Sequence, residues 1–204
     1  MKKLLLLLLC VPLIGFGQTC EEYFEKGLDY AEKGEYQLSI DNFTKCIIID
    51  PDEITLLGIK SIAFVNRGLS YRKLGNIKDA ISDFTRAIRL NPDYANAYVN
   101  RGIAYYNLEN YKNAIDDLTK AIIINPDFAI AYYNRGLSYY NLGNYEVAID
   151  DFTRAIRIDP DYTGAYINRG VAKSNTGLSY CSDFKRACEL GRKECCEWFQ
   201  EDCE

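Results

Sequence analysis

The chain has 204 residues, of which 48% are hydrophobic and 26% are charged, a composition typical of a folded domain or a short array of repeats. Its formal net charge is -5, so we expect no nucleic-acid partner, because binding to a phosphate backbone needs a basic surface. It contains no histidine, which excludes serine–histidine and cysteine–histidine catalysis and imidazole metal sites. We therefore expect a protein that is not an enzyme and that has no metal or other cofactor.

Residues 1–17 have the features of a secretory signal peptide. Lys2 and Lys3 give it a positive start, residues 4–14 are apolar, and small residues follow where a signal peptidase reads the chain. The apolar run is shorter than the roughly 20 residues that a membrane-spanning helix needs. We expect export, to the periplasm or the medium. A lipid anchor on Cys20 is the alternative, although the residues before it differ from those that lipidation sites prefer.

Residues 20–53 form the first copy of a 34-residue unit that predicts two antiparallel helices. Aromatic and small residues recur at i, i+4 and i+7, and a second stripe with the same spacing follows a turn glycine. A glycine suits the left-handed residue that ends a helix, and a proline ends the second helix. The pattern residues are Tyr23, Gly27, Tyr30, Gly34, Ser39, Phe43, Cys46 and Pro51.

Residues 54–60 are an insertion of close to two helical turns, so they can lengthen the next helix without rotating its buried face. We expect one helix from about Asp52 to Lys73. Its apolar residues Ile54, Leu57 and Ile59 either cover the first hairpin or offer apolar surface to a partner.

Three closer copies follow at residues 61–94, 95–128 and 129–162. We expect their pattern residues to form the core, because small residues let helices approach and aromatic residues fill the space between them. In the second of these copies Glu109 replaces the turn glycine. The pattern residues are Phe64, Gly68, Tyr71, Ala80, Phe84, Ala87 and Pro92; then Tyr98, Gly102, Tyr105, Ala114, Leu118, Ala121 and Pro126; then Tyr132, Gly136, Tyr139, Ala148, Phe152, Ala155 and Pro160.

Residues 163–190 are a degenerate fifth unit in which the second helix reaches Phe184 and Ala187 two residues early. Residues 191–204 then predict a third, cysteine-rich helix carrying Trp198 and Phe199. We interpret this helix as a cap that shields the last hairpin.

An aromatic residue followed by Gly, Tyr, Ala, Phe, Ala and Pro at these spacings resembles the tetratricopeptide repeat, and the resemblance extends over most of the chain. It implies an all-α fold, a right-handed superhelix of about five hairpins plus a C-terminal capping helix. It also implies a protein or peptide partner. No small-molecule substrate is evident, and peripheral association with a membrane is a further expectation.

Five cysteines stand close to the C-terminus, where export makes disulfides the default state. If the helices on either side of Gly191 are antiparallel, residues whose numbers have a constant sum face each other. This register pairs Cys188 with Cys196 and Cys181 with Cys203. The same segment resembles secreted, cysteine-bearing repeats related to tetratricopeptides, which supports the first of these pairs.

The other cysteines leave alternatives open. Cys10 lies in the leader, Cys46 is either a small buried residue or the partner of Cys20, and Cys195 is the candidate free thiol. A zinc site of four thiolates is the competing interpretation of the C-terminal cluster, and thiol–disulfide exchange lacks its usual Cys-x-x-Cys motif.

In the superhelix of this family, the first helices of successive hairpins line a concave groove that binds ligands. The resemblance places one column of asparagines there, and it is similar to the asparagine ladder of the O-linked N-acetylglucosamine transferase superhelix, which holds peptide backbones. A carboxamide can pair with both polar groups of a peptide backbone. The alternatives are that these side chains bond to neighbouring helices or merely reflect duplication. They are Asn66, Asn100, Asn134 and Asn168.

The residues that flank this column predict an apolar groove with amide and phenol edges. Tyr133 and Tyr140 are the candidate anchors, because tyrosine buries much area with few rotatable bonds. A clamp for a C-terminal carboxylate is not expected, since its positions hold Phe24, Leu28 and Asn96 together with Asn100. The flanking residues are Val65, Leu69, Val99, Ile103, Tyr133, Leu137, Ile167 and Val171, with Tyr106, Tyr140, Asn107 and Asn141 on the next turn.

A column of arginines stands next to the asparagines, and a column of aspartates recurs on the second helices. We predict that they form ion pairs within each hairpin. An acidic ligand is the alternative partner of the arginines. The columns are Arg67, Arg101, Arg135 and Arg169, and Asp83, Asp117, Asp151 and Asp183.

These features predict a non-catalytic scaffold or adaptor that binds an extended segment of another protein in its groove. The alternative is a structural component of an envelope or secreted assembly, which uses the convex face or the apolar extension at residues 54–62.

Overall fold

The structure is a computed structural model that describes residues 19–49 and 54–203. The expected leader at residues 1–17 therefore lies outside the described residues, as do Pro51 and Asp52. Within the described ranges the chain is all helical and contains no strand. The helices are α1 (Cys20–Glu32), α2 (Tyr36–Ile48), α3 (Ile54–Lys73), α4 (Ile77–Leu90), α5 (Ala95–Asn107), α6 (Tyr111–Ile124), α7 (Ala129–Asn141), α8 (Tyr145–Ile158), α9 (Thr163–Asn175), α10 (Cys181–Glu189) and α11 (Lys193–Cys203).

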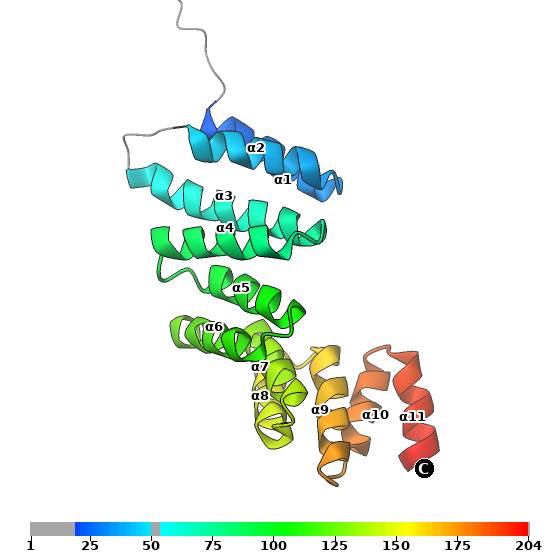
Figure 1. Cartoon of the computed structure of the whole chain (residues 1–204). Helices are drawn as coiled ribbons and strands as arrows, with labels where there is room; N and C mark the ends of the chain where they lie inside the picture. The colour runs from blue at the N-terminus through cyan, green and yellow to red at the C-terminus, as the bar shows by residue number, and fades with distance from the viewer. Residues whose placement is uncertain (1–18, 50–53, 204) are drawn as a thin grey trace, which may run out of the picture.

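Consecutive helices pair as hairpins that follow one another along an elongated array, from α1 and α2 at the blue end to α9, α10 and α11 at the red end (Figure 1). Each first helix packs against its own second helix, and each second helix packs against the first helix of the next hairpin. The successive first helices α1, α3, α5, α7 and α9 also contact one another directly. The predicted all-α solenoid is confirmed.

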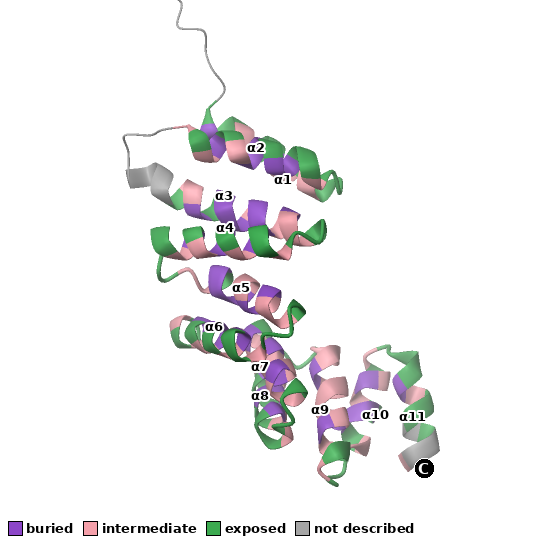
Figure 2. Cartoon of the chain, viewed as in Figure 1, coloured by how far each residue is buried: buried purple, intermediate pink, exposed green. Residues whose placement is uncertain are grey.

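Each hairpin closes where a large side chain of the second helix meets a glycine of the first. Phe152 on α8 is fully buried, and a Cβ atom at Gly136 on α7 would lie only 2.8 Å from its ring. Leu118 takes the place of the phenylalanine in the hairpin of α5 and α6, where it faces Gly102. Figure 2 shows the buried residues on the sides of the helices that face their neighbours. The stripes predicted as core therefore close the hairpins.

The turn between the two helices of a hairpin requires a residue in the left-handed backbone conformation. Gly143 fills this place between α7 and α8 with a φ of 79°. Between α5 and α6 the residue is Glu109, with a φ of 57°, and it is the one non-glycine residue with positive φ in the described ranges. This conformation costs an L-residue about 1–2 kcal/mol. The hairpin of α5 and α6 therefore contains local backbone strain.

Helix α3 is continuous over 20 residues, from Ile54 to Lys73. Ile59, one of the three apolar residues of the extension, packs against the core of the first hairpin beside Phe43 and Cys46. It therefore covers that hairpin. The side chains of Ile54 and Leu57 lie outside the part of the chain that the structure describes.

Disulfides hold both ends of the array. At the C-terminal end, Cys188–Cys196 and Cys181–Cys203 join α10 to α11, the pairs that an antiparallel register gives, and at the N-terminal end Cys20–Cys46 joins α1 to α2. Cys195 is a buried free thiol. The ring of Trp198 on α11 lies 5.5 Å from that of Phe184 on α10, so the last helix packs on the fifth hairpin.

Candidate functional site

The four predicted asparagines lie one on each of α3, α5, α7 and α9. In every case the carboxamide donates an N–H to the carbonyl oxygen four residues earlier in its own helix, at 2.7 Å in Asn134 and 2.9–3.0 Å in the others. This bond holds the side chain along its helix and uses one of its two N–H groups. Asn134 is also only 9% exposed. The column therefore presents fewer free hydrogen-bonding groups than a freely rotating carboxamide would.

A second set of hydrogen bonds links the first helices to one another. The carboxamide of Asn168 donates to the phenol oxygen of Tyr133 at 2.9 Å, and Asn141 donates to Tyr106 at 3.0 Å. Asn175 makes the same bond to Tyr140 at 3.3 Å. Each pair is 35 residues apart, one repeat plus one residue. The bond of Asn168 to Tyr133 is of the kind given as the alternative, in which the asparagines bond to neighbouring helices. The sequence contained the pattern as a tyrosine followed 35 residues later by an asparagine, but neither Asn175 nor the tyrosine partners were predicted.

These bridges leave specific groups free. Asn141, Asn168 and Asn175 each use their second N–H on the carbonyl four residues earlier, so only their amide oxygen remains, and it is an acceptor. Each bridged tyrosine accepts a hydrogen bond and keeps its own O–H to donate. We call the side of α3, α5, α7 and α9 that carries the four asparagines and the bridged tyrosines the tyrosine–asparagine face. It offers phenol donors and amide acceptors.

The tyrosine rings are held by aromatic neighbours. The centroid of the Tyr133 ring lies 4.7 Å from that of Tyr162 and 5.9 Å from that of Phe152. Tyr140 packs on Tyr145 in the same hairpin, with centroids 5.2 Å apart. Burial raises the pKa of Tyr133, and burial with the nearby Tyr133 raises the pKa of Tyr162 to about 12. Both phenols therefore remain protonated donors at neutral pH.

The predicted apolar flank is only partly available. Val65 and Val99 are 4% and 3% exposed and pack in the core, so assigning them to a ligand-contacting surface was wrong. They are buried because neighbouring hairpins close over them. Leu69, Ile103 and Leu137, at other predicted positions, are partly buried and keep some exposed surface.

The predicted ion pairs between arginine and aspartate are confirmed. Arg101 on α5 donates from Nε and Nη2 to the two carboxylate oxygens of Asp117 on α6, both at 2.7 Å. Its Nη1 donates to Thr85 Oγ1 on α4, in the preceding hairpin, at 3.0 Å. Arg67 and Arg135 bind Asp83 with Thr44 and Asp151 with Thr119 in the same way. The arginines therefore join three helices, and the threonine column that completes the arrangement was not predicted.

The fifth hairpin keeps the bond to threonine, from Arg169 Nη1 to Thr153 Oγ1 at 3.1 Å, but departs from this arrangement at the aspartate. Nε and Nη2 of Arg169 donate to one oxygen of Asp183, while Lys173 Nζ lies 2.9 Å from the other. Arg169 and Asp183 are 14 residues apart, against 16 in the other hairpins. Asp183 therefore stands two residues early, as predicted for Phe184 beside it. Lys173 pairs with the carboxylate oxygen that Arg169 does not reach.

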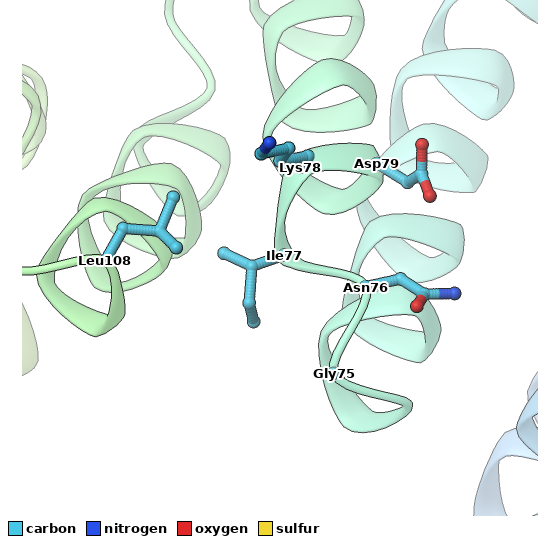
Figure 3. Close-up of a pocket in the computed structure, with 6 residues that line it drawn as sticks. All are labelled: Gly75, Asn76, Ile77, Lys78, Asp79 and Leu108. Atoms are coloured by element: carbon cyan, nitrogen blue, oxygen red, sulfur yellow. The ribbon is translucent and has the colours of Figure 1, made fainter.

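A hollow lies at the hairpin turns. A pocket of about 350 Å³ is formed by Gly75, Asn76, Ile77, Lys78, Asp79 and Leu108. Ile77, the first residue of α4, and Leu108, from the turn between α5 and α6, point toward one another across it, whereas Asn76 and Asp79 point away (Figure 3). None of these residues was predicted as part of a site.

Two further classes of site are not seen in residues 19–49 and 54–203. No three or more cysteine, aspartate or glutamate side chains gather there in a way that could hold a metal ion. No helix of that part of the chain has the length and apolar character needed to cross a bilayer.

Comparison with known proteins identifies the repeat. Residues 95–128 and 129–162 match the family model for the tetratricopeptide repeat, and residues 68–109 match a second model, described as TPR repeat. No curated protein matches the chain.

Several solved structures share the fold. MamA is 29% identical, with a TM-score of 0.71, over 82% of this chain and 95% of its own. The MamA fragment from Desulfovibrio magneticus RS-1 is 19% identical with a TM-score of 0.74, over 87% and 97%, and shows the fold alone. The TPR domain of Arabidopsis OM64 is 28% identical with a TM-score of 0.57, over 58% of this chain and 98% of its own.

Proposed function

We propose that this chain, a solenoid of tetratricopeptide repeats, is a non-catalytic scaffold or adaptor that binds an extended segment of another protein along its tyrosine–asparagine face. Tetratricopeptide domains generally bind proteins or peptides, and one of the similar structures, that of Arabidopsis OM64, is a TPR domain. The observation that supports this site is the row of bridges from Tyr106, Tyr133 and Tyr140 to the next first helix.

An extended peptide has N–H donors and carbonyl acceptors along its whole length, and the tyrosine–asparagine face provides complementary groups. The amide oxygens of Asn141, Asn168 and Asn175 accept, and the phenols of Tyr106, Tyr133 and Tyr140 donate. Because the bridges and ring contacts fix these side chains before binding, little rotamer freedom is lost when a peptide binds. The same groups recur on successive helices, so a long segment gains affinity from several modest contacts.

The compartment is part of the same proposal. Three disulfides fit an oxidising environment, and a signal peptide at residues 1–17 would take the chain there. We propose a periplasmic or secreted scaffold.

The test uses displayed random dodecapeptides as the probe, selected on the full chain and compared between variants. Asn141→Ala with Asn168→Ala removes two of the three bridging carboxamides whose oxygens the tyrosine–asparagine face offers, and we expect it to abolish the capture of most selected peptides with only a small fall in the melting temperature. Asn113→Ala is the matched control, because Asn113 is exposed on the second helix α6 and its side chain makes no hydrogen bond.

Unchanged capture by the double variant would refute the proposal. Binding would then be assigned to the second helices, where Ile48 and Ile123 are 73% and 66% exposed, as expected for the alternative of a structural assembly component.

A further inference from the structure

One position interrupts the tyrosine–asparagine bridges. Arg72 on α3 is at the place that Tyr106 and Tyr140 occupy in the next two copies, and Asn107 on α5 follows it by the same 35 residues that separate the bridged pairs. An arginine has no acceptor atom, so the bond from asparagine to tyrosine has no counterpart here. In the described part of the chain, no hydrogen bond or ion pair is made by the guanidinium of Arg72 or the carboxamide of Asn107.

Arg72 differs in this respect from the four arginines of the predicted column. Arg101, for example, is bound by Asp117 and Thr85, whereas Arg72 is partly buried and has no carboxylate beside it. Burial lowers the pKa of Arg72, and nothing offsets that effect; in Arg101 the hydrogen bond and charge of Asp117 outweigh the lowering by burial. A partly desolvated cation without a counter-ion gains free energy when an anion binds to it.

We propose that Arg72, together with Lys73 and Asn107, binds the carboxylate of an aspartate or glutamate in the extended segment that occupies the tyrosine–asparagine face; this rests on the proposed function. A guanidinium presents a planar pair of N–H donors that matches a carboxylate. Asn107, exposed on the adjacent helix, has N–H groups to donate to the same anion, and the exposed ammonium of Lys73 adds positive charge.

The rest of the face explains why one acidic residue would fix the register of the segment. From Tyr106 to Asn175 the bridging side chains are uncharged, so they bind backbone without regard to the peptide's sequence. Arg72 and Lys73 supply positive charge at the end of the row toward α3. A segment that slid by one repeat would place its carboxylate beside the phenol of Tyr106 and lose the ion pair.

The test compares Glu and Gln forms of the same peptide. Dodecapeptides are selected on the wild-type chain, each acidic residue is replaced in turn by its amide, and affinities are measured by isothermal titration calorimetry. We expect one replacement to weaken wild-type binding by about tenfold or more. Arg72→Tyr should bind the Glu and Gln forms equally well and retain the affinity of wild type for the Gln form, because the chain itself has tyrosine at this place in two other copies.

A control variant and three readouts distinguish failure of the Arg72 assignment from failure of the proposed scaffold function. Arg89→Tyr removes an exposed arginine from the second helix α4 and should leave the preference for Glu unchanged. Peptides whose capture requires Asn141 and Asn168 but that bind equally well in the Glu and Gln forms overturn the assignment of Arg72 and leave the proposed scaffold function unchanged. Peptides that depend on a free C-terminal carboxylate instead, lost on amidation, also overturn it. Failure to select any peptide overturns the proposed function and this inference with it.

Discussion

Replacing Arg135 by methionine tests how the array is held together. Arg135 is bound by Asp151 through two hydrogen bonds of 2.8 Å and by Thr119 through one of 3.0 Å. Arg135→Met removes all three and leaves Asp151, which is 4% exposed, as a buried carboxylate without a cation. Breaking a buried pair in this way costs about 3–5 kcal/mol. For a chain of this size the midpoint of thermal unfolding should fall by roughly 6–20 °C.

The loss should depend on pH in a defined direction. Burial raises the pKa of Asp151, since the hydrogen bond and charge of Arg135 only partly offset it. Without Arg135 the pKa rises further. A carboxyl group whose pKa is higher in the folded than in the unfolded state holds more protons when folded, so stability is lost as pH rises through that range. Arg135→Met should therefore be less destabilising at about pH 5 than at neutral pH.

The assay is thermal and denaturant unfolding followed by circular dichroism, at both pH values and without reductant. Arg135→Met combined with Asp151→Leu should regain most of the lost stability, because an apolar pair carries no buried charge. Arg157→Met, at an exposed position, is the control and should change the free energy of unfolding by less than about 0.5 kcal/mol. A loss that is equal at both pH values and is not regained in the double variant would refute the reasoning.

Three further outcomes follow from the structure. Glu109→Gly should stabilise the chain by about 1 kcal/mol, and Gly143→Glu should destabilise it by a similar amount, because both residues have positive φ. Denaturant midpoints measure both changes. A Glu109→Gly variant that is no more stable than wild type contradicts the expectation. Gly136→Ala should cost about 1–3 kcal/mol, since the new methyl group would lie 2.8 Å from Phe152. Alkylation of the denatured, unreduced chain should label Cys195 alone, and intact mass showing two or more labels from Cys20 onward would contradict the three disulfides.

The solenoid could be predicted because its determinants are local and recur at a fixed period. A small residue such as Gly136 and a large one such as Phe152 are separated by the same number of residues in the first four copies, so one interpretation applies to all four. The ion pair of Arg135 and Asp151 was accessible for the same reason, since both columns lie within one hairpin.

Contacts between hairpins were not accessible in the same way. The bond from Arg135 to Thr119 and that from Asn168 to Tyr133 depend on the rotation and offset between one hairpin and the next, which no single copy encodes. The burial of Val99 depends on the same packing. Columns considered one at a time therefore identified the residue types of the tyrosine–asparagine face but not which of their polar groups remain free.

The triplet Asn-Arg-Gly, present in four copies, shows how the array separates its two tasks. Successive helical residues project about 100° apart, so the three side chains of residues 134–136 point in three directions. Asn134 lies on the tyrosine–asparagine face, Arg135 reaches two other helices, and Gly136 admits Phe152. Arg72 takes part in neither the ion pairs nor the contact between glycine and phenylalanine that closes the hairpin, and its position is tyrosine in two later copies. A residue can change there without loss of the array, so that position is where one copy can acquire a ligand preference that the others lack.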